Sequence, residues 1–289
     1  MKEFCGEELI LKDSDTITYT QNLREGNKKM ENYLETDNMI LQSVGLFSSW
    51  CLHKPSRVLF DCGDGASLKL GYKVFVPRYL YISHGCLDHL SGLLSFIGIR
   101  NKTKGANDKP LDIYYPKNDK RCREYINFCL SFYGRLKYDV TVHEISHGMS
   151  NQVGKNMFIR AFKTVHTDYS LGYCVYEKSR RLKAGISPDS VSELIKSGVN
   201  RDTLTDEHEV NLFAYTLDNC GFDTKWVMGV KEIVLDCTFL NDEDRERYSH
   251  ATLTDCKWVI DEIKPKVAYL AHISPRYNQS EIKVVKVED

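Results

Sequence analysis

The stretch that decides the fold is Tyr81–Leu93, YISHGCLDHLSGL. An apolar run leads into His84, the pair Asp88 and His89 follows, and a second apolar run containing a glycine comes after the pair. This order is typical of a strand that delivers metal ligands to a loop in front of a helix. Cys86 stands between the two histidines of the loop. The stretch therefore predicts a metal site and leaves open what the cysteine does in it.

Polar residues also follow other strand-like runs, and strand ends are where loops converge on one site. One such histidine is more often structural than a ligand, but five of the nine histidines lie in these places, with carboxylates beside them. Imidazole and carboxylate bind Zn²⁺ or similar ions, and an aspartate can bridge two of them. Two ions roughly 3.5–4 Å apart activate a hydroxide for attack on a phosphoryl or acyl group, so we predict a two-metal hydrolase. The residues concerned are Asp61, His84, Asp88, His89, His166, Asp218, Asp236, His250 and His272.

Composition indicates an ordinary soluble globular protein of 289 residues, 42% hydrophobic and 27% charged. Lys and Arg number 39 against 40 Asp and Glu, a net charge of -1. No global field recruits nucleic acid, so a polyanion would have to be held by local basic patches or by metal.

The first fifteen residues contain no apolar signal region, and no segment of the sequence approaches the length of a membrane span. The ten cysteines form no CxxC pair or regular framework. We therefore expect a cytoplasmic or nuclear protein whose cysteines are mostly small buried residues in a reducing compartment.

Short runs rich in β-branched and aromatic residues, bounded by Gly, Pro, Asn or Asp, predict many strands. Helical patterns lie between some of them. With no repeat or long linker, this order predicts a single α/β domain over residues 1–289, with sheets packed between helix layers. The strand-like runs are 38–45, 57–63, 79–83, 111–116, 157–165, 171–177, 211–217, 232–240 and 267–274, and the helical runs are 88–100, 119–136, 187–198 and 251–264.

Two segments interrupt this order: the basic loop 100–110 and a long excursion at about 177–202. Either is solvated surface or contacts an anionic substrate, because long excursions in compact domains are often functional. We expect the second to face substrate.

Seven stretches resemble, in the same order, motifs of the metallo-β-lactamase superfamily, and within it of the short-form ribonuclease Z family, whose plant-type members are most similar. The stretches are VLFDCGDG, YISHGCLDHLSGL, AFKTVHTDYSLGYCVYEK, FAYTLDN, VLDCTFL, YSHAT and LAHISPRY, and the resemblance runs from about Asn38 to Tyr277. It implies the metallo-β-lactamase αββα sandwich.

The resemblance also implies roles for individual residues. A first Zn²⁺ would be held by His84 and His166, with Cys86 at the third protein position. A second would be held by Asp88, His89 and His272, and Asp218 would bridge the two ions. The catalytic residues would be His250 as general acid, Asp236 as the partner that orients it, or alternatively a turn cap, and Asp88; Asp61 would support a ligand histidine.

Four features depart from the family pattern. Cys86 replaces a histidine, so it is a ligand, or the first metal binds without it, or the first site is weakened. Leu217 replaces a glycine before the bridging aspartate, so the turn there must avoid a conformation that only glycine adopts easily. The excursion lacks the Gly-Pro element of the bacterial substrate-gripping arm, and the N-terminal region lacks the Pro-x-Lys-x-Arg-Asn loop.

The leading functional hypothesis is a zinc-dependent endoribonuclease that cleaves the 3′ trailer from pre-tRNA, acting as a homodimer. The alternatives are a phosphodiesterase of the same fold acting on a small substrate such as a cyclic nucleotide, and a non-catalytic scaffold. Basic residues clustered beside the site would favour the first, and scattered ones the second; they are Lys102, Lys104, Lys178, Arg180 and Arg181.

Overall fold

The computed structural model describes residues 17–19, 32–102, 109–245, 249–277 and 283–287. The N-terminal fifteen residues and Lys104 therefore lie outside the described residues. Within that part of the chain, no helix is long and apolar enough to cross a membrane.

One sheet has seven strands in the order β2-β3-β4-β5-β6-β7-β8. Strands β5 to β8 run parallel to one another, so their carboxyl ends lie on one edge of the sheet. The strands are β2 (Tyr33–Glu35), β3 (Met39–Val44), β4 (Ser48–His53), β5 (Val58–Phe60), β6 (Tyr79–Tyr81), β7 (Leu111–Pro116) and β8 (Val140–Ile145).

The other sheet has eight strands in the order β1-β15-β14-β13-β12-β11-β10-β9. Its central strands β12, β13 and β14 are parallel. The strands are β1 (Ile17–Tyr19), β9 (Ser150–Gln152), β10 (Met157–Lys163), β11 (Leu171–Leu182), β12 (Thr205–Thr216), β13 (Glu232–Asp236), β14 (Val267–Ala271) and β15 (Lys283–Val287).

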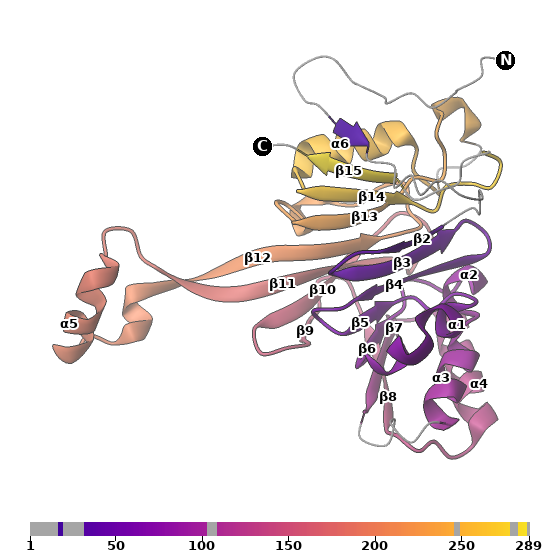
Figure 1. The fold of residues 1–289 in the computed structure, drawn as a ribbon, viewed down its shortest axis with the longest axis horizontal. Helices are drawn as coiled ribbons and strands as arrows, with labels where there is room; N and C mark the ends of the chain where they lie inside the picture. Colours follow the sequence, from indigo (N-terminus) through magenta and orange to yellow (C-terminus); the bar gives the residue numbers. More distant parts are fainter. Residues whose placement is uncertain (1–16, 20–31, 103–108, 246–248, 278–282, 288–289) are drawn as a thin grey trace.

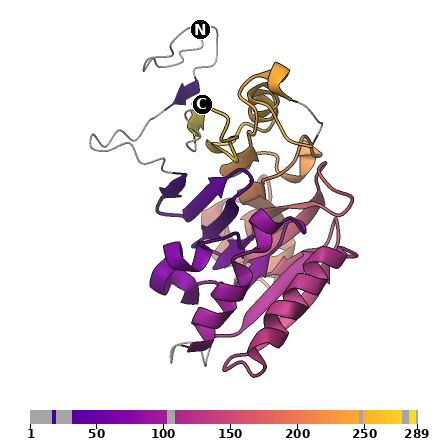
Figure 2. The ribbon, with the colours of Figure 1, turned by 90° about the vertical axis from the view of Figure 1, so that its right-hand side faces the viewer.

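The two sheets pack face to face, and helices cover both outer faces (Figures 1 and 2). The core between the sheets includes stacked rings such as Phe60 on Tyr215 and Phe60 on Tyr173. Helices α1 (Ala66–Leu70), α3 (Leu93–Lys102) and α4 (Lys120–Tyr133) cover the seven-stranded sheet. Helix α6 (Leu253–Ile263) covers the eight-stranded sheet. The predicted αββα sandwich is confirmed.

The helical run predicted over 88–100 is two helices, α2 (Leu87–Leu90) and α3. Gly92 lies at the break, and a Cβ there would come within 2.1 Å of the Gly63 carbonyl oxygen. This close approach to the loop after β5 bends the chain between the helices, which hydrophobic spacing alone does not reveal.

The excursion is an arm (Figure 1). Strands β11 and β12 continue as a paired ribbon away from the sandwich, and the tip carries α5 (Val191–Lys196). Ser187 accepts a hydrogen bond from the Asp189 amide and Pro188 follows it, as the helix-start pattern predicted. The short 3₁₀ helices are η1 (Gly71–Phe75), η3 (Pro188–Ser190), η4 (Arg201–Leu204), η5 (Thr224–Trp226) and η6 (Asp242–Asp244).

Candidate metal centre

The predicted ligands all follow strand ends, and the sandwich brings them together. They come from the segments after β6, β10, β12 and β14, at the edge where the parallel strands end, and Asp88 and His89 lie in the short helix α2. They form two groups in which the possible ligand atoms all lie within 4.8 Å of one another. The first group is His84, Cys86 and His166, and the second group is Asp88, His89, Asp218 and His272.

In the second group, imidazoles and carboxylates converge on one point. Asp218 Oδ1 lies 3.0 Å from His89 Nε2 and 3.2 Å from His272 Nε2. Asp88 Oδ2 lies 3.6 Å from each of the same two nitrogens. Ligand atoms around one tetrahedral Zn²⁺, with bonds of about 2.0–2.2 Å, are roughly 3.3 Å apart, so these separations suit a shared cation.

Asp218 faces both groups. Its Oδ1 points to the second group, whereas Oδ2 lies 3.8 Å from His84 Nε2 and 3.8 Å from His166 Nε2. The side chain is almost fully buried. One carboxylate with one oxygen on each side is the arrangement that a bridging ligand between two ions requires.

Hydrogen bonds fix how two imidazoles face the centre. His89 Nδ1 donates to Asp61 Oδ2 at 2.7 Å. His166 Nδ1 lies 2.9 Å from the Ser249 carbonyl, which can only accept. Each Nδ1 therefore carries the hydrogen, and each Nε2 presents a lone pair to the centre. Asp61, expected to support a ligand histidine, contacts one of the predicted ligands, His89.

Hydroxyl groups orient the other two imidazoles in the same way. Ser83 Oγ donates to Asp61 Oδ2 and therefore accepts from His84 Nδ1, which lies 2.9 Å away. Thr238 Oγ1 donates to Asp236 and accepts from His272 Nδ1, also at 2.9 Å. Ser83 and Thr238 are not among the residues predicted from the sequence, although each stands within two residues of a predicted site residue.

The inward-facing atoms lack hydrogen-bond partners. Among the described residues, His84 Nε2, His89 Nε2, His272 Nε2 and Asp218 Oδ1 are buried without one. Buried lone pairs that face one another are costly unless a cation or a proton lies between them. In the metal-free protein, burial alone would lower the pKa of His89, but Asp218 and Asp61 raise it well above its ordinary value. The donor set and its orphaned atoms fit divalent metal ions.

The backbone is strained where the strands deliver these residues. Asp61, Asp218 and His272 have φ values of 55°, 56° and 62°, a region that non-glycine residues rarely adopt. Such strain concentrates at functional sites. Leu217 avoids that region and its side chain is buried between the sheets. The turn thus accommodates the leucine by placing the left-handed residue at Asp218.

His250 lies beside the second group: possible ligand atoms of His250, Asp236, Asp218 and His272 all lie within 4.8 Å of one another. The His250 ring stacks on His272 at 5.2 Å, and its Nδ1 donates to Asp236 Oδ2 at 2.8 Å. Burial would lower the pKa of His250, but the hydrogen bond to Asp236 raises it to about 9. In the metal-free protein, the imidazole therefore carries a second proton at neutral pH, the form that can act as an acid.

Asp236 contacts both His250 and the backbone of its own turn. Besides His250, its oxygens accept hydrogen bonds from the Asn219 amide and from the amide and hydroxyl of Thr238. The carboxylate is fully engaged as an acceptor and buried. It closes the turn after β13 and positions His250 through the same oxygens.

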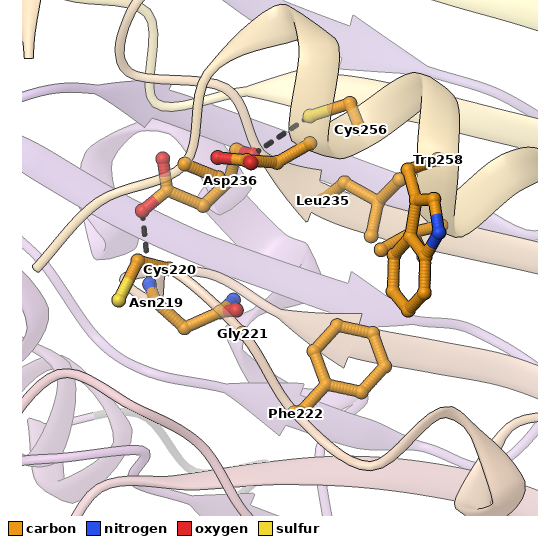
Figure 3. A pocket seen from close by; sticks show the side chains of 11 residues that line it. Asn219, Cys220, Gly221, Phe222, Leu235, Asp236, Cys256 and Trp258 are labelled. Atoms are coloured by element: carbon orange, nitrogen blue, oxygen red, sulfur yellow. Dashed lines mark hydrogen bonds between the residues drawn. The ribbon is translucent and has the colours of Figure 1, made fainter. Parts of the chain in front are cut away.

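A pocket of about 220 Å³ lies behind Asp236, between α6 and the loop that follows β12 (Figure 3). Phe222 and Trp258 line it at the end away from Asp236, and Cys256 donates to the Asp236 carbonyl. It contains none of the predicted metal ligands, so the chemistry lies beside this pocket and outside it.

Of the basic residues named above, the four that the structure describes do not gather at the centre. Lys102 ends α3, on the opposite side of the molecule from the arm that carries Lys178, Arg180 and Arg181 (Figure 1). On the arm, Lys178 pairs with Glu207, and Arg180 with Asp202. The arm strands thus balance much of their positive charge internally.

Solved structures of similar fold belong to metallo-β-lactamase fold proteins and to a tRNase Z. The chain matches the metallo-β-lactamase fold protein YhfI of Bacillus subtilis with a TM-score of 0.57 at 16% identity, over 83% of this chain and 88% of that one. It matches human tRNase Z, short form, with a TM-score of 0.62 at 17% identity, over 86% and 97%. The protein has the metallo-β-lactamase fold.

Sequence comparison is more specific. The chain is 27% identical to tRNase Z TRZ1 of Arabidopsis thaliana over 252 residues, which is 81% of this chain and 84% of the relative. No family model matches the chain. The predicted resemblance to ribonuclease Z, including its plant-type members, is confirmed.

Proposed function

We propose that the protein is a metal-dependent phosphodiester hydrolase that cleaves the 3′ trailer from pre-tRNA. The observation that carries this proposal is the pair of ligand groups facing the two oxygens of Asp218. The similarity to a plant tRNase Z over most of the chain supports the choice of substrate.

We propose Zn²⁺ at both sites, because histidine, aspartate and cysteine form a typical zinc donor set. The second ion would be held by Asp88, His89 and His272, the first by His84 and His166, and Asp218 would touch both. When bound, two such ions polarise a phosphoryl oxygen and supply a hydroxide nucleophile at neutral pH. The geometry of the chain's own residues accounts for the remaining steps.

His250 is the residue that would protonate the leaving oxygen. Its Nδ1–H is held by Asp236, so the Nε2–H of the protonated ring is the proton available for transfer. Stacking on His272 places this ring beside the second group. Cleavage on that side would leave a 3′-hydroxyl on the tRNA and a 5′-phosphate on the trailer.

We further propose that the chain forms a single domain whose arm contacts the body of the tRNA, as in the family it resembles. Contact with the phosphates would have to recruit side chains that now pair with Glu207 and Asp202. The expected homodimer would bury exposed aromatic rings, and α4 presents two, Phe128 and Phe132, at 52% and 63% exposure.

We propose a cytoplasmic location. Each of the nine cysteines in the described residues is free, and seven of them are buried. Free thiols in this number suit a reducing compartment.

A small-substrate phosphodiesterase is the second candidate, and one observation favours it. The described basic residues scatter, and Lys178 and Arg180 on the arm are paired with acids. A cyclic nucleotide needs only the metal centre and a nearby pocket, whereas a tRNA needs an extended cationic surface.

One assay separates the candidates. Metal-loaded protein is incubated with a pre-tRNA carrying a 3′ trailer, with cyclic nucleotides and with a chromogenic aryl phosphodiester. We expect a single cut at the 3′ trailer, and a loss of roughly 10²–10⁴-fold in this activity for His250→Ala. Cleavage of cyclic nucleotides alone would select the second candidate, and cleavage of no substrate by protein of confirmed metal content would show a scaffold.

A shortened arm tests the tRNA surface separately. Replacing residues 183–204 with a tight turn removes the tip and leaves the metal ligands in place. We expect the KM for pre-tRNA to rise while cleavage of the aryl phosphodiester is unchanged. Equal effects on both substrates would contradict a role of the arm in binding.

A further inference from the structure

The two ligand groups differ in chemistry, because only the first contains sulfur. We propose that the Cys86 thiolate is a protein ligand of the first metal site, which makes this site selective for thiophilic divalent ions, whereas the second site offers only nitrogen and oxygen. The proposal rests on the proposed function in one respect, that both groups bind metal.

The sulfur is within reach of an ion held by the histidines. Cys86 Sγ and the ligand nitrogens of His84 and His166 all lie within 4.8 Å of one another. Bonds of about 2.3 Å to sulfur and 2.0–2.1 Å to nitrogen place such atoms roughly 3.6 Å apart, so the sulfur and a nitrogen have to approach each other by about 1.2 Å at most. His84 Nε2, fully buried and without a hydrogen-bond partner among the described residues, needs such an ion.

The backbone on both sides of Cys86 is fixed. Cys86 precedes α2 in an extended conformation, with φ -79° and ψ 147°, and its carbonyl accepts from the His89 amide at 3.1 Å. A Cβ on the preceding Gly85 would lie 2.7 Å from Arg121 Cβ and 2.8 Å from Asp119 Oδ1. A side chain at position 85 would thus push the loop away from α4, and the glycine lets the cysteine take its place near the histidines.

Cys86 is also unlike the core cysteines. Seven others are buried, and each of these belongs to one of the three apolar clusters, whereas Cys86 is half-buried and belongs to none. Within the described part of the chain, no hydrogen bond to the Cys86 thiol is formed. The other half-buried cysteine, Cys220, donates to the Val165 carbonyl and stands outside the ligand groups, so it is a matched control.

A thiolate changes which ions the site prefers. Soft sulfur ligands favour Zn²⁺, Cd²⁺ or Co²⁺ over Mg²⁺ and Mn²⁺, which prefer carboxylate and water. Binding exchanges the thiol proton for the metal ion, so one proton is released to solvent for each first-site ion. Thiophilic ions should therefore prefer the first site, whereas Mg²⁺ and Mn²⁺ should prefer the second.

The experiment uses the full-length protein, stripped of metal and titrated with Co²⁺. Near-ultraviolet absorption reports sulfur-to-cobalt charge transfer, and atomic emission after dialysis reports the number of ions. We expect two ions and a sulfur band in the wild type. Cys86→Ser should lose the band and weaken the first site at least about tenfold. Cys220→Ser should keep both ions and the band.

Three results would overturn the proposal. The first is two ions in the wild type without a sulfur band, which would leave the proposed function standing. The second is a band that persists in Cys86→Ser. The third is no bound ion at all, which would overturn the proposed function as well. X-ray absorption of the wild-type zinc protein needs no variant: a sulfur neighbour near 2.3 Å supports the proposal, and its absence contradicts it.

Discussion

The two ligand groups share Asp218 but are held in place by different partners. In the second group, His89 is anchored directly by the buried carboxylate of Asp61, and His272 by Thr238, which is itself bound to Asp236. In the first group, His84 is anchored by the Ser83 hydroxyl, which is itself bound to Asp61, and His166 by a main-chain carbonyl, so only His89 in the second group is held directly by a carboxylate. Charged buried partners fix geometry more strongly than neutral ones. The second group is therefore the more rigid half of the centre. The first group is the half in which Cys86 stands where the family that the chain resembles has a histidine.

Replacing Asp218 should have the largest effect, because this residue faces both ligand groups. In Asp218→Asn the side chain keeps its size and loses the charge that faces both groups. We expect both ions to be lost or greatly weakened. The several kcal/mol that two ions contribute correspond to a loss of about 10³-fold or more in kcat/KM. Metal content and pre-tRNA cleavage measure this, and two retained ions would contradict a bridging role.

The next effect concerns the proton donor beside the second group. In Asp236→Asn, His250 loses the charge that raises its pKa from 6.5 to about 9. A group with a raised pKa stays protonated up to that pKa, so the wild type keeps its acid form until the pH approaches 9. In the variant the pKa falls back toward or below 6.5, because burial lowers it. We expect the basic limb of the kcat profile to move to lower pH and kcat at pH 7 to fall at least about fourfold, because a group with a pKa of 6.5 is only about one quarter protonated there. An unshifted profile would remove Asp236 from this role.

Much of this centre is predictable from the sequence, because the ligands sit at strand ends. The apolar runs predicted β5, β6, β12, β13 and β14, and the polar residue after each predicted an edge where they meet. The predicted runs left out β1, β2, β4, β8, β9 and β15. Strand β4 (SSWCLH) lacks alternation because it is buried throughout, and in β8 (VTVHEI) the alternation ends at the polar pair His143 and Glu144.

Other features depend on three-dimensional contacts that spacing does not encode. The left-handed backbone at Asp61, Asp218 and His272 follows from the packing of the loops, since none of these is a glycine. The roles of Ser83 and Thr238 depend on hydroxyl orientation across two strands. The internal ion pairs of the arm arise because β11 and β12 are antiparallel neighbours, which the sequence separation hides.

Asp61→Asn tests whether a buried carboxylate makes the second group rigid. Asp61 accepts from His89, Ser83 and Tyr215, so an amide would leave one donor facing another. We expect metal affinity at the second site to fall by 10–100-fold, the usual effect of losing such a support. The matched control is Asp64→Asn, an exposed carboxylate three residues on that should leave affinity unchanged. Equal metal affinities in the two variants would contradict the idea that the Asp61 carboxylate makes the second group rigid.

The smallest predicted effects come from the two hydroxyls, and they differ in reach. Thr238 contacts His272 and Asp236, so Thr238→Ala should weaken only the second site. Ser83 contacts both His84 and Asp61, and Asp61 in turn holds His89, so Ser83→Ala should weaken both sites. Each loss is about 1 kcal/mol, or roughly fivefold in affinity. Stepwise Co²⁺ titration resolves the two sites if the sulfur band reports the first alone. If Ser83→Ala changed the first site and left the second intact, the two groups would be coupled only through Asp218, and the Ser83–Asp61 link would be a local support.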